Sequence, residues 1–145
     1  MVDLKAKPFY LKDEDISWVK DTINSMTLDE KTGQLFCPIG IFDGIEYLEH
    51  LAKDLHIGGL LFREDKGLKI QNAHRILQSA SKVPLFLAAN VETGGNGIAS
   101  DGTGFGEQMN AAAADDKTFA YTLGKIAAVE GSALGLNLAF GPIVD

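Results

Sequence analysis

The sequence predicts an α/β fold in which parallel strands alternate with helices. Three features support this class: short strands that are apolar on both faces, amphipathic helices between them, and polar loops after the strands. Strands of this kind are typical of a parallel sheet covered by helices. The chain has 145 residues, 46% of them hydrophobic, which is enough for one ordinary domain with its own core.

The leading segment 1–26 is expected to form a helix. Ile16, Val19, Ile23 and Met26 recur at helical spacing and make one apolar stripe. We expect this stripe to lie across the base of the fold.

A capping box formed by Thr27 and Glu30 predicts the start of a second, short helix, because the hydroxyl and the carboxylate satisfy free backbone amides there. Strand and helix repeats then fill residues 27–145. No linker, low-complexity tract or repeat interrupts the chain, so we expect residues 1–145 to form a single domain.

Apolar periodicity places the repeats in order along the chain. The expected strands cover residues 35–39, 57–62, 85–89 and 138–144, and the expected helices cover 45–55, 68–80 and a long segment that follows the loop 92–106. The inner faces of the first two helices are expected at Ile45, Leu48, Ala52 and Leu55 and at Ile70, Ala73, Leu77 and Ala80. The long helix is expected to run through Phe119, Leu123, Ile126 and Ala133. Either Asp115 or Asp116 can cap the long helix, and Gly135 is suited to end it.

Charge and composition limit the classes of molecule that the protein is expected to bind. Thirteen Lys and Arg against twenty Asp and Glu give a net charge of −7, with the basic residues scattered, which argues against binding to nucleic acid or to an anionic membrane. The single cysteine, Cys37, excludes an internal disulfide, and we expect it to be a small buried side chain. Because no apolar run is long enough for a signal peptide or a membrane span, we expect a cytoplasmic protein.

Polar residues that follow the expected strands are the candidates for a site, because loops after parallel strands converge on one face. Asn90 and Glu92 open a glycine-rich loop, Arg63 follows the second strand, and Asp145 ends the last one. Arg63 lies in a charged cluster that is more typical of solvated surface. The three histidines, His50, His56 and His74, lie in or beside helix patterns, so surface or helix-end positions explain them better than metal ligation.

Four motifs in the same order resemble the amino-terminal part of a glycoside hydrolase family 3 barrel, closest to the branch of β-N-acetylhexosaminidases. The motifs are 26–36, 57–62, 90–95 and 134–145. The resemblance implies the first part of a (β/α)8 barrel of the TIM type. Since a complete barrel needs roughly 250 residues, it is incomplete in this chain, which would supply the first four strands.

The resemblance also implies an activity. Members of this family cleave β-linked sugars with retention, using an Asp nucleophile and a separate acid/base group that both lie further along the barrel. No catalytic residue is therefore expected in this chain, and the chain alone is expected to be inactive. Carbohydrate is the implied substrate, with β-N-acetylhexosaminides as the implied class, and no metal or cofactor is implied.

Site residues follow from the same resemblance. The family's loop pattern Asp-Gln-Glu-Gly-Gly-Arg aligns with Asn90 to Gly95, and its first Asp binds sugar hydroxyls. Asn90 is expected to contact sugar without a charge, whereas Glu92 either holds the loop through backbone amides or meets the sugar. Gly95 replaces the Arg that usually anchors this loop. Asp145 matches an acid that orients active-site groups or contacts sugar.

Two other functions stay open at this point. One is a carbohydrate-binding or scaffold half-barrel without catalysis. The other is a flavodoxin-like nucleotide-binding domain, against which the acidic balance and the absence of a phosphate-binding fingerprint weigh. A half-barrel also leaves its outer strands unpaired, so we expect a homo-oligomer formed through exposed strand edges.

Overall fold

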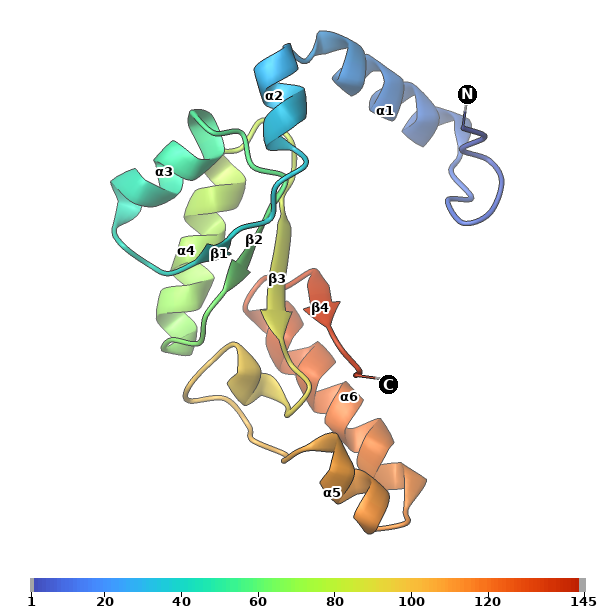
Figure 1. The fold of residues 1–145 in the computed structure, drawn as a ribbon, viewed down its shortest axis with the longest axis vertical. Coiled ribbons are helices and arrows are strands. Elements are labelled where there is room, and N and C mark those ends of the chain that lie inside the picture. Colours follow the sequence, from blue (N-terminus) through green and yellow to red (C-terminus); the bar gives the residue numbers. More distant parts are fainter. Residues whose placement is uncertain (1, 144–145) are drawn as a thin grey trace.

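A computed structural model describes residues 2–143. Its four parallel strands form one sheet in the sequential order β1-β2-β3-β4 (Figure 1). The strands are β1 (Ile39–Gly40), β2 (Gly59–Phe62), β3 (Phe86–Asn90) and β4 (Leu138–Phe140). The helices are α1 (Asp13–Ser25), α2 (Leu28–Gly33), α3 (Ile45–Lys53), α4 (Gly67–Ala80), α5 (Gln108–Ala113) and α6 (Lys117–Ala133), with a short 3₁₀ helix η1 (Gly95–Gly97). Parallel strands that alternate with helices confirm the predicted fold class.

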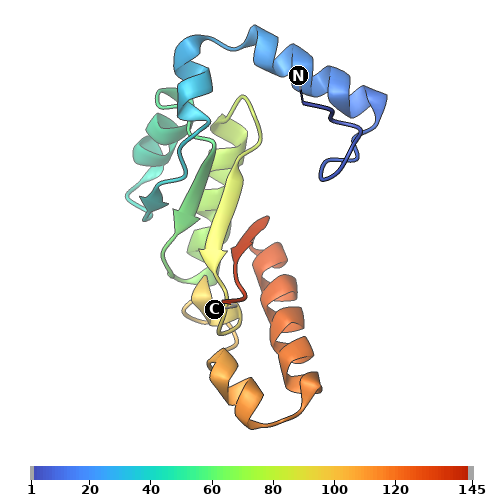
Figure 2. The ribbon, with the colours of Figure 1, turned by 45° about the vertical axis from the view of Figure 1, so that its right-hand side comes forward.

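Helices cover one face of this sheet. Leu60 and Phe62 of β2 and Leu87 of β3 are buried and belong to one apolar cluster with residues of α3 and α4, including Leu48 and Ile70. Figure 2 shows α4 behind β2 and β3. The core therefore lies between the sheet and its helices, as in an α/β domain.

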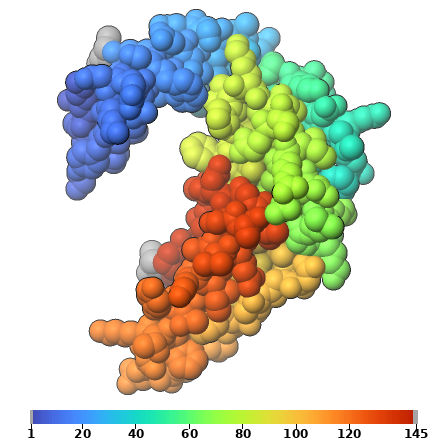
Figure 3. Space-filling model, turned by 180° about the vertical axis from the view of Figure 1, so that it is seen from behind, coloured from blue at the N-terminus to red at the C-terminus, as the bar shows by residue number. Residues whose placement is uncertain are grey.

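The opposite face of the sheet is open. Strand alternation and register place Ile39, Phe86 and Phe140 on it, and these side chains are 59%, 62% and 44% exposed. The molecule is an open crescent, with the amino-terminal residues and the α5–α6 pair as its two arms (Figure 3). It exposes 9379 Å², whereas a compact monomer of this mass exposes about 7,200 Å².

Several sequence-based boundaries are confirmed. Thr27 and Glu30 form the capping box, with the Thr27 amide donating to Glu30 over 2.7 Å. Asp116, rather than Asp115, caps α6 by accepting from the amide of Thr118. Gly135 follows the helix with φ of 93°, a left-handed conformation that glycine adopts without strain and that ends many helices.

The strand expected at 35–39 was largely wrong. Only Ile39 of that segment is in β1, because the amides of Leu35 and Phe36 bond back to α2 carbonyls and keep the chain in turns after the helix. Leu35 is 84% exposed, and Cys37 is exposed rather than buried. An apolar run after a short helix was mistaken for a buried strand.

The packing predicted for α1 was also wrong. The helix forms, but none of its residues is buried, and it extends away from the sheet (Figure 1). The described strands do not reach beneath it, so Ile23 of its apolar stripe is exposed and Ile16 and Val19 are only half-buried. One other predicted face needs a smaller correction: Ile45 and Leu55 near α3 are exposed, and Leu51 is buried instead. Helix α5 had not been expected.

His74 is buried, which corrects the expected surface or helix-end position. It lies on α4, is 2% exposed, and places its Nδ1 2.8 Å from the carbonyl oxygen of Leu134, just after α6. Its ring meets Phe62 edge-on at 5.2 Å. Burial lowers the pKa of His74, outweighing the bond to Leu134. His74 thus joins α4 to the end of α6 as a neutral side chain.

This burial predicts that acid weakens the fold. Because the pKa of His74 is lower when folded, the unfolded chain binds the proton more readily, so stability is complete above about pH 6.5 and falls below it, by at most about 1.4 kcal/mol per pH unit. Urea unfolding at pH 7.5 and 5.0 measures the loss. In His74→Phe, the loss of unfolding free energy between the two pH values should be smaller by the contribution of this histidine. The exposed variant His50→Gln should lose as much as wild type. An equal loss in His74→Phe and wild type would contradict the assignment.

Candidate functional site

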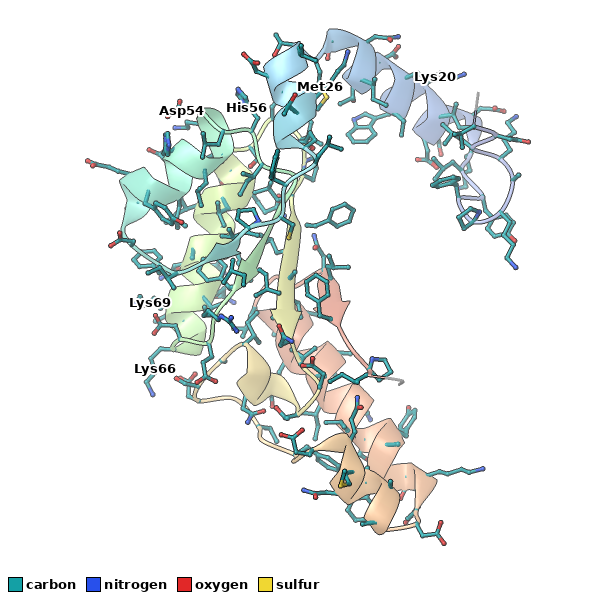
Figure 4. All side chains as sticks on the ribbon, in the orientation of Figure 1. Lys20, Met26, Asp54, His56, Lys66 and Lys69 are labelled. Atoms are coloured by element: carbon teal, nitrogen blue, oxygen red, sulfur yellow. The ribbon has the colours of Figure 1, made fainter. Side chains whose placement is uncertain are left out.

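The candidate residues lie at the carboxyl edge of the sheet. Asn90 ends β3, and Arg63 directly follows β2. Figure 4 shows Lys66 and Lys69 at this end of the molecule, near the start of α4, and Asp54 and His56 at the opposite end. Carboxyl ends of parallel strands are where α/β folds assemble ligand sites.

Asn90 and Glu92 come together as a hydrogen-bonded pair. The Asn90 Nδ2 donates to Glu92 Oε1 over 2.9 Å, with Asn90 exposed and Glu92 half-buried. Gly141, after β4, packs against this pair: a Cβ there would lie 3.3 Å from Glu92 Cγ, and its φ is 154°. The pair is thus framed by the ends of two neighbouring strands.

The other two predicted residues do not join this pair in the described structure. Arg63 is exposed, and its backbone amide donates to the Gly40 carbonyl, which extends the pairing of β1 and β2. Asp145 lies outside the described residues. Two of the four candidates, Asn90 and Glu92, therefore lie together in the described structure.

The glycine-rich loop 91–106 folds back on itself. Phe105 donates to the Thr93 carbonyl over 2.8 Å, and Asn96 donates to the Thr103 carbonyl over 3.3 Å. Gly97 passes directly over the end of β3, so that a Cβ added there would overlap the Asn90 carbonyl oxygen. Glycine at this point serves close backbone packing.

Two carboxylates missed by sequence reasoning tie this loop to helices. Glu130 of α6 accepts from the amide of Thr103 over 2.8 Å and from its hydroxyl, and Asp101 accepts from the amide of Gly67 at the start of α4 over 2.8 Å. These bonds lower the pKa of both carboxyls. One signal pointed to Glu130: it shares a helix face with buried Leu123, and a carboxylate in an apolar stripe needs a partner.

A groove of about 780 Å³ lies beside Glu92, between α5, α6 and β4. Its walls include the small side chains of Ala111, Ala120 and Ala127, and polar residues such as Asp116 and Asn137 also line it. Where the chain leaves β4, the Gln108 side-chain amide faces the Ile143 backbone, and the amide orientation that satisfies both groups would donate over 3.0 Å and accept over 3.2 Å. The volume of the groove and its mostly apolar lining fall within the range of small-molecule pockets.

Two further searches concern the described part of the chain. Within residues 2–143, no three His, Cys, Asp or Glu side chains are grouped so that they could hold a metal ion. None of the helices described there has the length and apolar character needed to cross a membrane. The described strands also follow one another without a reversal of order, so the flavodoxin-like alternative lacks its nucleotide-binding switch point.

Similar sequences are glycosidases. Over all its 145 residues the chain is 39% identical to a β-N-acetylglucosaminidase/β-glucosidase from Cellulomonas fimi and covers 26% of it. It is 29% identical, over 133 residues, to a periplasmic β-glucosidase from Salmonella typhimurium, with 89% of this chain and 16% of that protein covered. The chain thus spans about a quarter or less of the length of these relatives.

Similar solved structures also belong to proteins that are named for action on β-glycosides. A β-glucoside phosphorylase bound to 2FGlc superposes with a TM-score of 0.90 at 39% identity, over 98% of this chain and 26% of that one. A glycoside hydrolase family 3 β-N-acetylglucosaminidase from Paenibacillus superposes with a TM-score of 0.65 at 26% identity, over 81% of this chain and 24% of that one.

The periplasmic relative corrects the expected cytoplasmic location, which was wrong as an inference. The lack of an apolar leader in a sequence does not identify its compartment when a relative works outside the cytoplasm. The family itself is shown directly, since the model of the glycosyl hydrolase family 3 N terminal domain matches residues 27–145. The chain belongs to glycosyl hydrolase family 3, as the amino-terminal part of its N-terminal domain.

Proposed function

We propose that this chain is the amino-terminal part of a retaining glycoside hydrolase that acts on β-linked glucosides and N-acetylglucosaminides. Family membership and the names of the Cellulomonas and Paenibacillus relatives support this substrate class. In the proposal, residues 1–145 are one domain, with 1–26 as a leading helix and 27–145 as the strand and helix repeats of a barrel.

The Asn90–Glu92 pair carries the proposal. An amide side chain has two N–H donors and one carbonyl acceptor. One donor of Asn90 is used by Glu92, which leaves a donor and an acceptor on an exposed side chain at the strand ends. Such a pair suits neighbouring sugar hydroxyls, and Glu92 offers a charged acceptor beside it. Arg63 and Asp145 stay proposed contributors to the same edge.

The bond-breaking groups are assigned outside this chain. Retaining hydrolysis needs two groups about 5 Å apart across the glycosidic bond, one as nucleophile and one as acid/base. Since the chain spans 26% of the Cellulomonas relative, most of a comparable protein lies elsewhere. In this proposal the chain binds sugar and does not hydrolyse it; a carbohydrate-binding module would share that property.

Phosphorolysis is a second candidate for the reaction of the whole protein. The phosphorylase structures reach 39% and 40% identity and TM-scores of 0.90 and 0.85 with this chain. The binding role of Asn90 and Glu92 is the same for both reactions. A longer protein that contains this chain would release a sugar 1-phosphate in phosphate buffer if it is a phosphorylase, and the free sugar if it is a hydrolase.

Sugar binding by the 145-residue chain tests the proposed site. Titration with glucose and N-acetylglucosamine should shift the Asn90 side-chain amide resonances in NMR spectra, with no turnover of an aryl β-glycoside. Asn90→Ala should weaken binding about fivefold, because it removes a neutral hydrogen bond of about 1 kcal/mol. Asn72→Ala, on the exposed face of α4, is the matched control. Equal binding by Asn90→Ala and wild type would count against the site.

Self-association of this chain is a further proposal. The open sheet face and the unpaired edges of β1 and β4 leave about 2,200 Å² more surface than a compact monomer of this mass exposes. Sedimentation should therefore show dimers or larger species. Phe86→Lys, on the open face, should weaken association, whereas Tyr121→Lys, exposed on α6, should not. A compact monomer at high concentration would contradict this expectation.

A further inference from the structure

One carboxylate on α6 holds the turn of the glycine-rich loop. Glu130 accepts hydrogen bonds from both the amide and the hydroxyl of Thr103. Its carboxylate lies directly against Gly95, where any Cβ would overlap it. These contacts cross the loop at its centre, so the lack of a side chain at residue 95 is what allows the carboxylate to reach Thr103.

The helix behind Glu130 is firmly packed. Leu123 and Ala127, seven and three residues earlier on α6, are 7% and 8% exposed. Positions at these spacings lie on one helix face. The carboxylate is therefore presented from a rigid element, and the two bonds from Thr103 keep its pKa below the usual range, so that it is charged at neutral pH.

A short series of contacts leads from Thr103 to the candidate site. The Thr103 carbonyl accepts from Asn96, and the adjoining Phe105 donates to Thr93, the residue after Glu92. On the other side of this turn, Gly97 lies against the carbonyl of Asn90. Fixing Thr103 thus restricts both segments that flank the Asn90–Glu92 pair.

We propose that Glu130, acting through Thr103, is a positioning residue that fixes the loop 91–106 and thereby holds Asn90 and Glu92 for contact with a sugar. The inference rests on the proposed sugar-binding function of that pair. Asp101 fixes the loop separately, through Gly67 of α4. Loss of Glu130 therefore loosens one part of the loop and leaves the sheet and its core in place.

The test compares Glu130→Ala, Thr103→Val and Thr103→Ser in the 145-residue chain, with Glu107→Ala as the matched control. Glu107 is an exposed carboxylate at the start of α5 and makes no capping bond there. Amide hydrogen exchange reports the order of the loop, and NMR titration with glucose and N-acetylglucosamine reports sugar affinity. The two readouts are independent.

In Glu130→Ala, exchange at Thr103, Asn96 and Phe105 should rise at least tenfold, with exchange at Leu87 in β3 unchanged. Sugar affinity should fall about fivefold. Thr103→Val should show part of both effects, and Thr103→Ser, which keeps the hydroxyl, should restore wild-type values. Glu107→Ala should match wild type in both measurements.

Different results would contradict the positioning role of Glu130 and the proposed sugar-binding function. Wild-type exchange in Glu130→Ala, or a loosened loop with unchanged sugar affinity, would overturn the positioning role. Absence of sugar binding by the wild-type chain would overturn the proposed function, whatever the exchange data show. Global loss of protection, including Leu87, would make Glu130 a determinant of the whole fold and would also overturn the positioning role.

Discussion

The one-sided packing of the parallel sheet governs the rest of this structure. Leu60 and Leu87 are buried under helices, whereas Phe86 and Phe140 on the other face meet solvent. Parallel sheets are normally covered on both faces. The open face explains the crescent shape, the large exposed area and the unpacked α1 together, because each of these features lacks the same opposing layer of structure.

Within this frame, side chains on the helices order the loop at the carboxyl edge. The sheet sets where β3 ends, but the path of the chain after Asn90 depends on Glu130 of α6 and on Asp101, which bonds the start of α4. Glu130 accepts from a loop amide, and Asp101 accepts from an amide at a helix start that has no partner within the helix. The glycines then allow two loop segments and a carboxylate to pack closely together. This packing accounts for the glycine-rich composition of the loop, with no need for a phosphate-binding role.

Local signals predicted local structure well, and long-range contacts escaped them. The capping box at Thr27 and the stop at Gly135 depend on neighbouring residues and are found as predicted, and of the two predicted caps of α6 the structure has Asp116. His74 and Glu130 depend on partners 60 and 27 residues away, which periodicity does not reveal. The predictions that Cys37 is buried and that α1 packs on the fold were wrong for another reason. An apolar pattern indicates that a residue can be buried, but only the completed layers decide whether it is.

Two loop residues, Asn90 and Gly95, differ in charge from the Asp and Arg of the family's loop pattern, and each change fits the hydrogen bonds of a neighbouring carboxylate. The Asn90 amide lies 2.9 Å from the Glu92 carboxylate, and an Asp at residue 90, as in the family's loop pattern, would set two carboxylates side by side. Like charges at that distance repel, whereas an amide donates a hydrogen bond. At residue 95 the chain has Gly in place of the family's Arg, and the Glu130 carboxylate beside it accepts hydrogen bonds from Thr103 instead. Glu92 and Glu130 thus each have a hydrogen-bond donor, and the Thr103 contacts hold the loop without a cation at residue 95.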